Sequence, residues 1–545
     1  MSIKKFAKLF DQLDSNNSIN KKVSYLTEYF ENNSNLNNIW TIYLLLGKKN
    51  KRFISGKSLR KYYSDIYKMP LWLIENCYSK VGDSAELISL LLKDKINEKD
   101  IEEDIDLDEL LNYLLPNLSK LEEDKKIYNI KSLWENLKKD NHLVFNKILS
   151  GTFRVGVSKG LVTKALAKMI DIDESIIQHR LMGEFKPNSE TYEFLVNRKS
   201  CKAELSYKPY PFQLANTFEQ KIKEINSIKE FQFEYKWDGI RSQLIKRSNN
   251  ISIWTRGEEL VNNTFPELIK IISDINFDFV IDGEILIWEI NNDYPKDFSI
   301  LQKRLGRKSP SKKIQTEYPV VFMAYDILEI NGKDLREQSL IERRKELERN
   351  FCNKNNIEDY FKFSKKIKIT NILKVTNWQK VEELKISARR INTEGLVIKN
   401  KNSKYLSGRK KGNWWKYKID PMQLDGILIY ARPGSGKRAN LYTDYSFALW
   451  ENNKLITFAN AYTGLSNKEI KELDKWIRKN TVEKFGPVRS VKPELVFEIS
   501  FDNIQFSKRH KSGIAVRFPR ITKWRKDKKI EDADNLESAL KLIKI

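Results

Sequence analysis

Cysteine and histidine are both scarce in this chain of 545 residues, which contains three of each. The cysteines, Cys77, Cys201 and Cys352, lie far apart, so the sequence offers neither a CxxC metal site nor a disulfide framework. The three histidines are scattered as widely, which argues against a zinc centre and against a histidine-based catalytic triad.

Long apolar runs are also missing. No stretch reaches the roughly 18 apolar residues that a membrane-spanning helix needs. The first residues, MSIKKFAKLFDQLD, have the pattern of an amphipathic helix rather than of a signal peptide. We therefore expect a reducing, cytoplasmic compartment.

Negative charge is in short supply: 98 Lys and Arg residues face 73 Asp and Glu residues, a net charge of +25. Such an excess favours a polyanionic partner, because each phosphate that a cation neutralises releases counterions. The alternative is a solvated surface in a generally lysine-rich protein. At this length one hydrophobic core is too small, so several domains are expected.

The pattern along the chain divides it into three domains. Residues 1–203 place apolar residues at helical spacing, in segments that include Lys22–Phe30, Leu59–Tyr67, Asp83–Lys95 and Ser132–Leu149. Residues 204–420 alternate short β-rich runs with helical stretches, which predicts an α+β domain. Residues 421–545 contain several strand-like runs and one helix near Asn467–Asn480, the pattern of a small β-barrel of the OB type.

The strongest chemical signal is the string Glu234-Tyr235-Lys236-Trp237-Asp238-Gly239-Ile240-Arg241. A lysine that leaves a strand and is followed by Asp-Gly and then Arg suits nucleotidyl transfer. Its amine attacks an α-phosphate, the glycine lets backbone approach the nucleotide, and the arginine offers a planar donor fork. Alone, a KxDGxR string is also compatible with a strand-edge lysine beside a turn.

Further strings follow in a fixed order downstream. They are DGE at Asp282–Glu284, VVFMAYD at Val320–Asp326, EGLVIK at Glu394–Lys399, WWKYK at Trp414–Lys418 and RFPR at Arg517–Arg520. Each of them has a structural explanation by itself. Their joint order and spacing make chance a poor explanation.

Together these strings resemble the six motifs of the covalent nucleotidyltransferase superfamily, and within it those of ATP-dependent DNA ligases. The similarity covers roughly Lys208–Lys529, and the N-terminal FRVGVS turn is similar to the family's helical DNA-binding domain. The resemblance implies an all-α N-terminal domain, an α+β nucleotidyltransferase domain of ATP-grasp-like type, and a C-terminal OB-fold β-barrel.

The resemblance also implies residue roles. Lys236 is expected to be the catalytic nucleophile that becomes adenylated. Nucleotide-binding roles fall on Glu234 at the adenine edge, Phe322 stacked on adenine, Arg241 and Arg256 at phosphate, Glu284 at the ribose, Lys416 and Lys418 at the α-phosphate, and Arg517 and Lys528 at the leaving pyrophosphate. Glu284 and Glu394 are expected to hold Mg²⁺ (or Mn²⁺), which keeps waters and substrate phosphates and so needs few protein carboxylates.

Basic segments predict where DNA is bound. A glycine-rich turn carries Arg154 and Lys159 before a helix, an arrangement that suits phosphate, although an ordinary interhelical turn explains it as well. Arg304 lies in KRLGRKSPSKK, and Arg409 and Lys410 lie in SKYLSGRKKGNWWKYK. These segments are candidates for the DNA backbone, with a solvated loop as the alternative for the first.

The sequence thus predicts an enzyme that uses ATP to seal nicks in double-stranded DNA through a lysyl-AMP intermediate. We expect a monomer in the cytoplasm of a prokaryotic type of cell, associated with the nucleoid. An RNA ligase or an mRNA-capping nucleotidyltransferase is the nearest alternative, and a catalytically inactive DNA-end-binding scaffold is another. An NAD⁺-dependent ligase is disfavoured because a four-cysteine zinc site is lacking.

Overall fold

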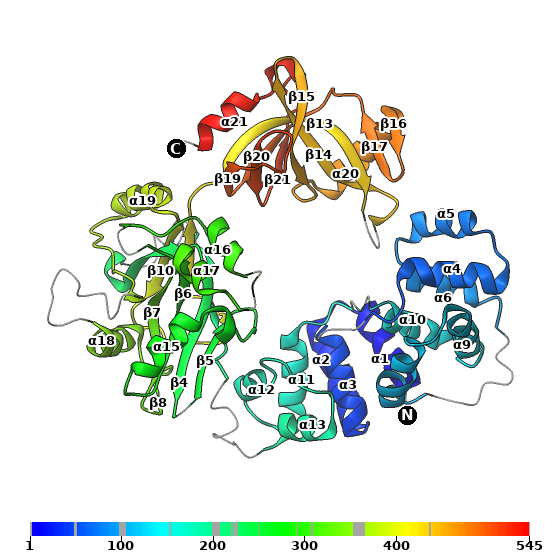
Figure 1. The fold of residues 1–545 in the computed structure, drawn as a ribbon, viewed down its shortest axis with the longest axis horizontal. Coiled ribbons are helices and arrows are strands. Elements are labelled where there is room, and N and C mark those ends of the chain that lie inside the picture. The colour runs from blue at the N-terminus through cyan, green and yellow to red at the C-terminus, as the bar shows by residue number, and fades with distance from the viewer. Residues whose placement is uncertain are drawn as a thin grey trace. The chain divides into compact units, whose positions relative to one another are not determined.

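The computed structural model describes residues 3–47, 52–96, 105–151, 153, 155–198, 208–219, 222, 227–248, 250–289, 292–305, 307, 309–352, 366–434 and 438–543 (Figure 1). Among these residues no helix is long and apolar enough to cross a membrane. Internal contacts divide the chain after Val162 and after Ile419. The predicted boundary between residues 203 and 204 lies outside the described residues and stays a prediction.

The first part of the chain is helical. Its α-helices are α1 (Ile3–Ser15), α2 (Ile19–Glu31), α3 (Asn35–Leu45), α4 (Gly56–Tyr67), α5 (Leu71–Val81), α6 (Ser84–Leu92), α7 (Leu107–Glu109), α8 (Leu115–Leu118), α9 (Glu123–Glu135), α10 (His142–Ser150), α11 (Lys159–Ile170), α12 (Glu174–Arg180) and α13 (Ser189–Val196). Serine N-caps stabilise the start of α3 and α4: the side chains of Ser34 and Ser55 accept hydrogen bonds from backbone N–H groups of the first turn.

One helix prediction is wrong in this region. The sequence pattern suggested a continuous helix over Ser132–Leu149, but α9 ends at Glu135 and α10 begins at His142. The break is stabilised locally, because buried His142 pairs with the carbonyl oxygen of Trp134 across it at 2.8 Å. Apolar spacing continued through the break because both helices bury residues in the same N-terminal region.

Two antiparallel-rich sheets form the middle part. The four-stranded sheet has the order β2 (Asn216–Thr217), β12 (Trp414–Lys418), β10 (Thr393–Asn400), β3 (Phe231–Trp237). The other sheet has the order β5 (Asn250–Thr255), β4 (Ile240–Arg247), β6 (Phe279–Ile287), β7 (Val320–Ile330), β8 (Lys333–Asp334), with β9 (Ile367–Ile369) also paired to β7. A short parallel pair joins β1 (Gln213–Leu214) to β11 (Gly408–Arg409).

Each sheet buries one face under helices. Odd-numbered residues of β6 belong to a core cluster with α15 (Pro266–Asp274) and α18 (Leu340–Phe351). In the four-stranded sheet, Phe231, Phe233 and Leu396 pack in a cluster with Val381 of α19 (Trp378–Ser387). Because side chains alternate along a strand, residues one position away point to the opposite faces, which carry the polar residues of interest.

The C-terminal part is strand-rich, as predicted. Its main sheet has the order β15 (Lys454–Ala461), β14 (Tyr442–Glu451), β13 (Met422–Pro433), β17 (Val488–Val491), β16 (Thr481–Phe485), with β18 (Val496–Phe501) paired to β13 and β21 (Arg520–Trp524) paired to β18. Helix α20 (Asn467–Lys479) connects β15 to β16 along the chain. A separate hairpin joins β19 (Asn503–Phe506) to β20 (Ile514–Arg517). Helix α21 (Leu536–Ile543) ends the described chain.

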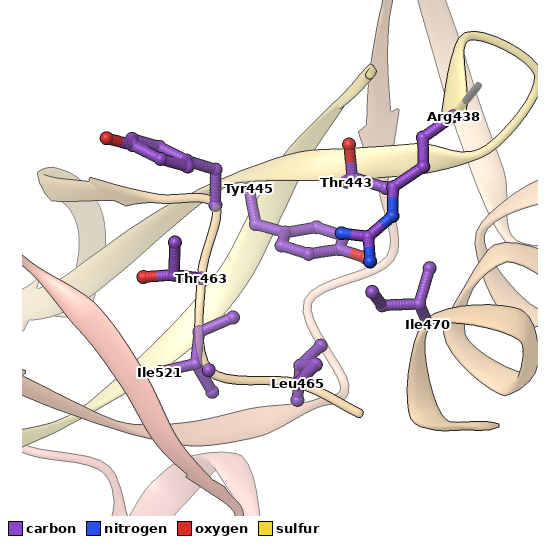
Figure 2. A pocket seen from close by; sticks show the side chains of 9 residues that line it. Arg438, Thr443, Tyr445, Thr463, Leu465, Ile470 and Ile521 are labelled. Atoms are coloured by element: carbon purple, nitrogen blue, oxygen red, sulfur yellow. The ribbon is translucent and has the colours of Figure 1, made fainter. Parts of the chain in front are cut away.

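A pocket of about 240 Å³ lies in this C-terminal part (Figure 2). Its lining combines the Arg438 guanidinium and the hydroxyls of Thr443 and Thr463 with the apolar side chains of Leu465 and Ile521. None of the residues predicted to act in catalysis lines this pocket.

Candidate active site

Lys236 lies where the chain passes from one sheet of the middle part to the other. It is the penultimate residue of β3, which belongs to the four-stranded sheet, and β4 of the second sheet begins at Ile240. Gly239 lies in the connection, and a Cβ atom there would be 2.3 Å from the carbonyl oxygen of Ile285. A glycine is therefore required for the connection to pass so close to β6.

A carboxylate bridges Lys236 to a second lysine. Lys236 Nζ lies 2.6 Å from Glu394 Oε2, and Lys418 Nζ lies 3.2 Å from the same oxygen. The positive charges of Lys236 and Lys418 outweigh burial and lower the pKa of Glu394 to about 2. Glu394 is therefore an anion that holds both lysines of the predicted set at one point.

Further cations gather around this carboxylate. Burial, followed by repulsion from Arg409, Lys418 and Lys236, lowers the pKa of Lys416. One face of the four-stranded sheet carries the side chains of Lys236, Lys416 and Lys418. In the pairing of β10 with β12 and β3, Val397 lies opposite both Lys416 and Glu234, and residues two positions apart on a strand share a face. This concentration of positive charge favours an anionic ligand such as a chain of phosphates.

Glu284 lies opposite these cations in the second sheet. It is paired with Arg241 across β4 and β6. Burial raises the pKa of Glu284 to about 8, although Lys236 and Arg241 act in the other direction. Its side chain is half-buried and forms no hydrogen bond or ion pair with the other described residues, so it is available to a cation or a hydroxyl group.

Glu234 is held by a buried ion pair beneath Lys236. Its two carboxylate oxygens lie 2.9 and 2.8 Å from Lys399 Nζ, and both side chains are 2% exposed. Gln232 Nε2 donates a further hydrogen bond to Glu234 at 2.6 Å. Lys399 Nζ also lies 4.6 Å from the ring centre of Tyr325 and 4.4 Å from that of Trp414.

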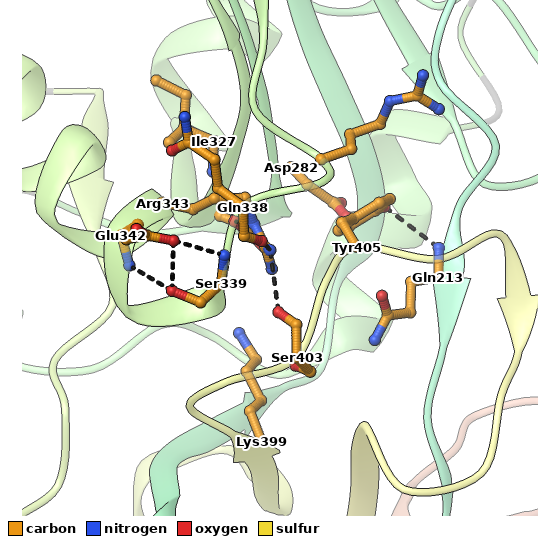
Figure 3. A network of polar contacts seen from close by, with 12 residues as sticks. Gln213, Asp282, Ile327, Gln338, Ser339, Glu342, Arg343, Lys399, Ser403 and Tyr405 are labelled. Atoms are coloured by element: carbon orange, nitrogen blue, oxygen red, sulfur yellow. Dashed lines mark hydrogen bonds and ion pairs between the residues drawn. The ribbon is translucent and has the colours of Figure 1, made fainter.

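Arg241 is likewise already bound within the protein. Its guanidinium forms two hydrogen bonds with Asp282, at 3.2 and 2.7 Å, and donates a third to the backbone oxygen of Gln213 at 2.5 Å. Tyr405 donates to Asp282 Oδ2, the oxygen that also accepts the shorter of these bonds from Arg241, at 2.6 Å; Figure 3 shows the surrounding network. Asp282 raises the pKa of Arg241 well above its ordinary value despite burial.

Three family models match the chain, one in each of its three parts. A family model described as ATP dependent DNA ligase domain matches residues 212–418, the DNA ligase N terminus model matches residues 2–167, and the ATP dependent DNA ligase C terminal region model matches residues 438–528. A probable DNA ligase of Koribacter versatilis is 32% identical over 409 residues, which span 72% of this chain and 70% of that protein. This chain belongs to the ATP-dependent DNA ligases.

Other relatives agree with this assignment. DNA ligase 2 of Methanosarcina mazei is 30% identical over 434 residues, covering 76% of this chain and 73% of that protein. A solved structure titled Pmar-Lig_PreS3 shares the fold with a TM-score of 0.59 at 16% identity, over 95% of this chain and 99% of that chain. The ligase is thus an ATP-using enzyme of a family that seals nicks through an adenylate intermediate.

The structure contradicts the predicted role of Phe322. Its ring is fully buried in the cluster between the sheet and its helices, against Gly283. It therefore lies on the face of β7 opposite to that of Glu284 and has no surface for a nucleotide base. Tyr325 is the aromatic residue of this strand beside the ionic residues, at a position where the pairing of β6 and β7 is irregular.

The structure also contradicts DNA binding by Arg304. Its side chain is completely buried, lies 2.9 Å from Glu267, and donates to the backbone oxygens of Tyr318 and Thr264. Such a guanidinium stabilises the domain and has no exposed surface to meet DNA. The basic string around it was a poor guide, because Arg304 faces inward from α16 (Phe298–Leu305).

The roles of the other predicted residues stay predictions. Arg256, Arg409 and Lys410 are exposed, and Lys159 is the first residue of α11. Arg154 lies outside the described residues. Two belong to the C-terminal part: Arg517 ends β20, and Lys528 is ion-paired with Asp425 at 2.5 Å.

Sequence reasoning passed over several residues that the structure brings to this site. They are Asp282, Tyr325, Lys399 and Tyr405. Each lies in one of the strings: Asp282 in DGE, Tyr325 in AYD, Lys399 in EGLVIK and Tyr405 in SKYLSGRKK. Their roles were hidden because a string does not reveal which buried partner a side chain will meet.

The raised pKa of Glu284 predicts that the stability of the protein falls as the pH rises. The folded state keeps a proton on Glu284 up to about pH 8, whereas the unfolded chain releases it near the ordinary value of 4.5. The wild type should therefore lose stability relative to Glu284→Gln as the pH rises from about 5 to about 8, by on the order of 2 kcal/mol after solvent screening. Urea unfolding of both proteins across this range measures the difference. A difference that stays constant with pH would contradict the prediction, and Glu451→Gln, at an exposed position, serves as the control.

Proposed function

We propose that this ligase seals nicks in double-stranded DNA as a monomer, with Lys236 as the residue that becomes adenylated. The observation that carries the proposal is the Lys236–Glu394–Lys418 group, in which one carboxylate oxygen holds two ammonium groups within 2.6 and 3.2 Å. This group is positioned by paired strands rather than by a loop, and rigid positioning is what phosphoryl transfer requires.

In the proposed first step the ammonium group of Lys236 gives a proton to solvent, and the resulting neutral amine attacks the α-phosphorus of ATP. A P–N bond forms, the P–O bond breaks with its electron pair leaving on pyrophosphate, and the nitrogen releases one further proton to solvent. Lys416 and Lys418 neutralise the charge that develops on the phosphate oxygens. Glu394 keeps Lys236 in place until ATP enters.

AMP is then transferred from Lys236 to the 5′-phosphate at the nick, and the 3′-hydroxyl displaces AMP to form the phosphodiester bond. Arg241 and Arg256 would contact the phosphates. Their backbones are adjacent, since the N–H of Arg256 donates to the carbonyl oxygen of Arg241 at 2.8 Å. Arg517 and Lys528 are proposed to act on the leaving pyrophosphate from the C-terminal part. Glu234, fixed by Lys399, is proposed to contact the adenine edge.

Mg²⁺ fits the residues present. The half-buried side chain of Glu284 has no hydrogen bond or ion pair with the other described residues, and Glu394 would be the second ligand. No group of three or more His, Cys, Asp or Glu residues suited to a metal occurs in the described part of the chain. That agrees with an ion that keeps waters and substrate phosphates as ligands. When bound, Mg²⁺ would supply positive charge at the phosphates.

Labelled nucleotide tests the proposal directly. The protein is incubated with Mg²⁺ and labelled ATP, GTP or NAD⁺, denatured, and examined for covalent label. Label from ATP alone supports the proposal, label from GTP favours a capping-type enzyme, and label from none of the nucleotides leaves a DNA-end-binding scaffold. Sealing of nicked DNA compared with nicked RNA then identifies the substrate.

DNA contacts are proposed at Lys159, Arg409 and Lys410, and also at the loop between β19 and β20. This loop, residues 507–513 (SKRHKSG), exposes Lys508, Arg509 and Lys511. Among the described residues no ion pair is recorded for these three side chains, whereas Arg520, Arg525, Lys526 and Lys528 of the same part are paired with carboxylates. Connections between OB-type strands bind oligonucleotides in many proteins.

Removing the three charges of this loop should weaken the salt dependence of DNA binding. For Lys508→Ala/Arg509→Ala/Lys511→Ala we expect the slope of log K against log salt to fall by about 2 to 3. Titration of nicked duplex at several salt concentrations measures the slope. Lys468→Ala/Lys471→Ala/Lys475→Ala removes the same charge from exposed positions of α20 and serves as the control. Equal slopes for the two triple variants would show that the loop is not a DNA contact.

A further inference from the structure

The backbone and side chain of Gln213 connect the nucleotide-binding residues to the strand that carries Arg409. Gln213 is fully buried. Its backbone oxygen accepts a hydrogen bond from Arg241 at 2.5 Å, and its side-chain oxygen accepts one from the backbone N–H of Leu406 at 2.6 Å. It also pairs with Gly408 in the parallel β1–β11 ladder. One residue thus contacts both segments.

Tyr405 completes the connection from the other side. Its hydroxyl donates to Asp282 at 2.6 Å and accepts from the backbone N–H of Gln213 at 3.2 Å (Figure 3). The ring is 3% exposed. Asp282 is the carboxylate that holds the guanidinium of Arg241 at two points. A single buried hydroxyl therefore connects the Arg241–Asp282 pair to Gln213.

The segment that follows Tyr405 leads to the proposed DNA contacts. It is anchored on its N-terminal side, where Arg343 donates to the backbone oxygen of Ser403 at 3.1 Å and is itself paired with Asp326. Past Tyr405 it forms β11, which carries Arg409 and precedes Lys410. Arg409 is close enough to Lys416 to affect that residue's ionisation. Movement of Tyr405 would therefore shift both Arg241 and β11.

We propose that Tyr405 and Gln213 are positioning residues that couple the nucleotide-binding site of the ligase to its DNA-contacting strand β11. The proposal rests on the proposed function of Arg241 and Arg409. In this buried network, loss of the Tyr405 hydroxyl removes the acceptor of the Gln213 N–H. It also removes one of the hydrogen bonds to Asp282, which keeps those from Arg241. The arrangement of Arg241 and that of Arg409 then relax together rather than separately.

A double-mutant cycle tests the coupling. Tyr405→Phe, Arg409→Ala and the double variant are compared with the wild type in sealing a pre-adenylated nick, with the self-adenylation rate measured in parallel. We expect Tyr405→Phe to slow both reactions by about 10-fold, and the loss in the double variant to be at least about 3-fold smaller than the product of the single losses. Gln213→Met, which removes the acceptor for Leu406, should show the same non-additivity with Arg409→Ala.

The control separates positioning from general loss of stability. Tyr63→Phe removes the hydroxyl of another fully buried tyrosine, which donates to the Leu91 carbonyl oxygen at 3.1 Å in the helical part. We expect this variant to match Tyr405→Phe in thermal stability and to act additively with Arg409→Ala. Additive losses for Tyr405→Phe and Gln213→Met with Arg409→Ala would overturn the proposal. Absence of sealing by the wild type would instead overturn the proposed function.

Discussion

Replacement of Lys236 by alanine is expected to abolish self-adenylation, with a fall in rate of at least about 10⁴-fold. Lys236 Nζ lies 2.6 Å from Glu394 near the end of β3, and Lys418, which lies 3.2 Å from the same oxygen, is proposed to neutralise phosphate charge rather than to attack. A covalent nucleophile cannot be replaced by positioning alone, because the bond to AMP has no atom on which to form. Transfer of label from ATP to protein that survives denaturation measures the loss.

The later steps should survive in part. Sealing of a nick that already carries AMP is proposed to need Lys416, Lys418 and Arg241 at the phosphates but not the Lys236 amine. Lys333→Ala, which removes an exposed lysine of β8, is the matched control and should label normally. If Lys236→Ala still acquired AMP from ATP, the assignment of Lys236 would be wrong. If it also lost the sealing of adenylated nicks completely, Lys236 would have a further role in positioning the phosphate.

Replacement of Lys399 by methionine should give the largest loss of stability. It leaves the Glu234 carboxylate without a cation at a site that is 2% exposed, and an uncompensated buried charge costs about 3–5 kcal/mol. Gln232 remains as a donor but supplies one hydrogen bond in place of three. Urea unfolding followed by intrinsic fluorescence measures the shift in the midpoint.

Two further variants identify the cause of this loss. Glu234→Gln/Lys399→Met removes the charge together with its partner and should regain most of the stability. Lys380→Met breaks an ion pair of similar length, 2.9 Å to Glu383, but one that is 49% and 54% exposed. It should cost less than about 1 kcal/mol. Equal losses for Lys399→Met and Lys380→Met would show that burial of the Glu234–Lys399 pair is not the cause.

Local patterns were sufficient to predict most of the elements. The helix predicted near Asn467–Asn480 is α20, Asn467–Lys479, and the predicted segment Leu59–Tyr67 lies within α4, Gly56–Tyr67. Apolar periodicity and capping residues are signals between residues close in sequence, so the sequence alone predicts the elements that depend on them. The error over Ser132–Leu149 arose because an interruption that leaves the apolar spacing unchanged has no periodic signal.

The site was only partly predictable for the same reason. Lys236, Glu394 and Lys418 were predicted from their strings, and the structure brings their charged atoms together. The string around Arg304 predicted an exposed cation, but the guanidinium is buried against Glu267. A string of residue types reports composition, whereas burial depends on which distant segment packs against it.

For Lys236, the sequence by itself predicted a lysine as the nucleophile and determined the order of the motifs along the chain. The tertiary structure alone decided its partners, because Glu394 and Lys418 are more than 150 residues away and are brought to it by the pairing of β3, β10 and β12. It also decided that Tyr325 rather than Phe322 faces the ionic residues, since the face of a strand is set by its pairing and its irregularities. Pairing between distant strands is a property of the whole folded domain, and no local string encodes it.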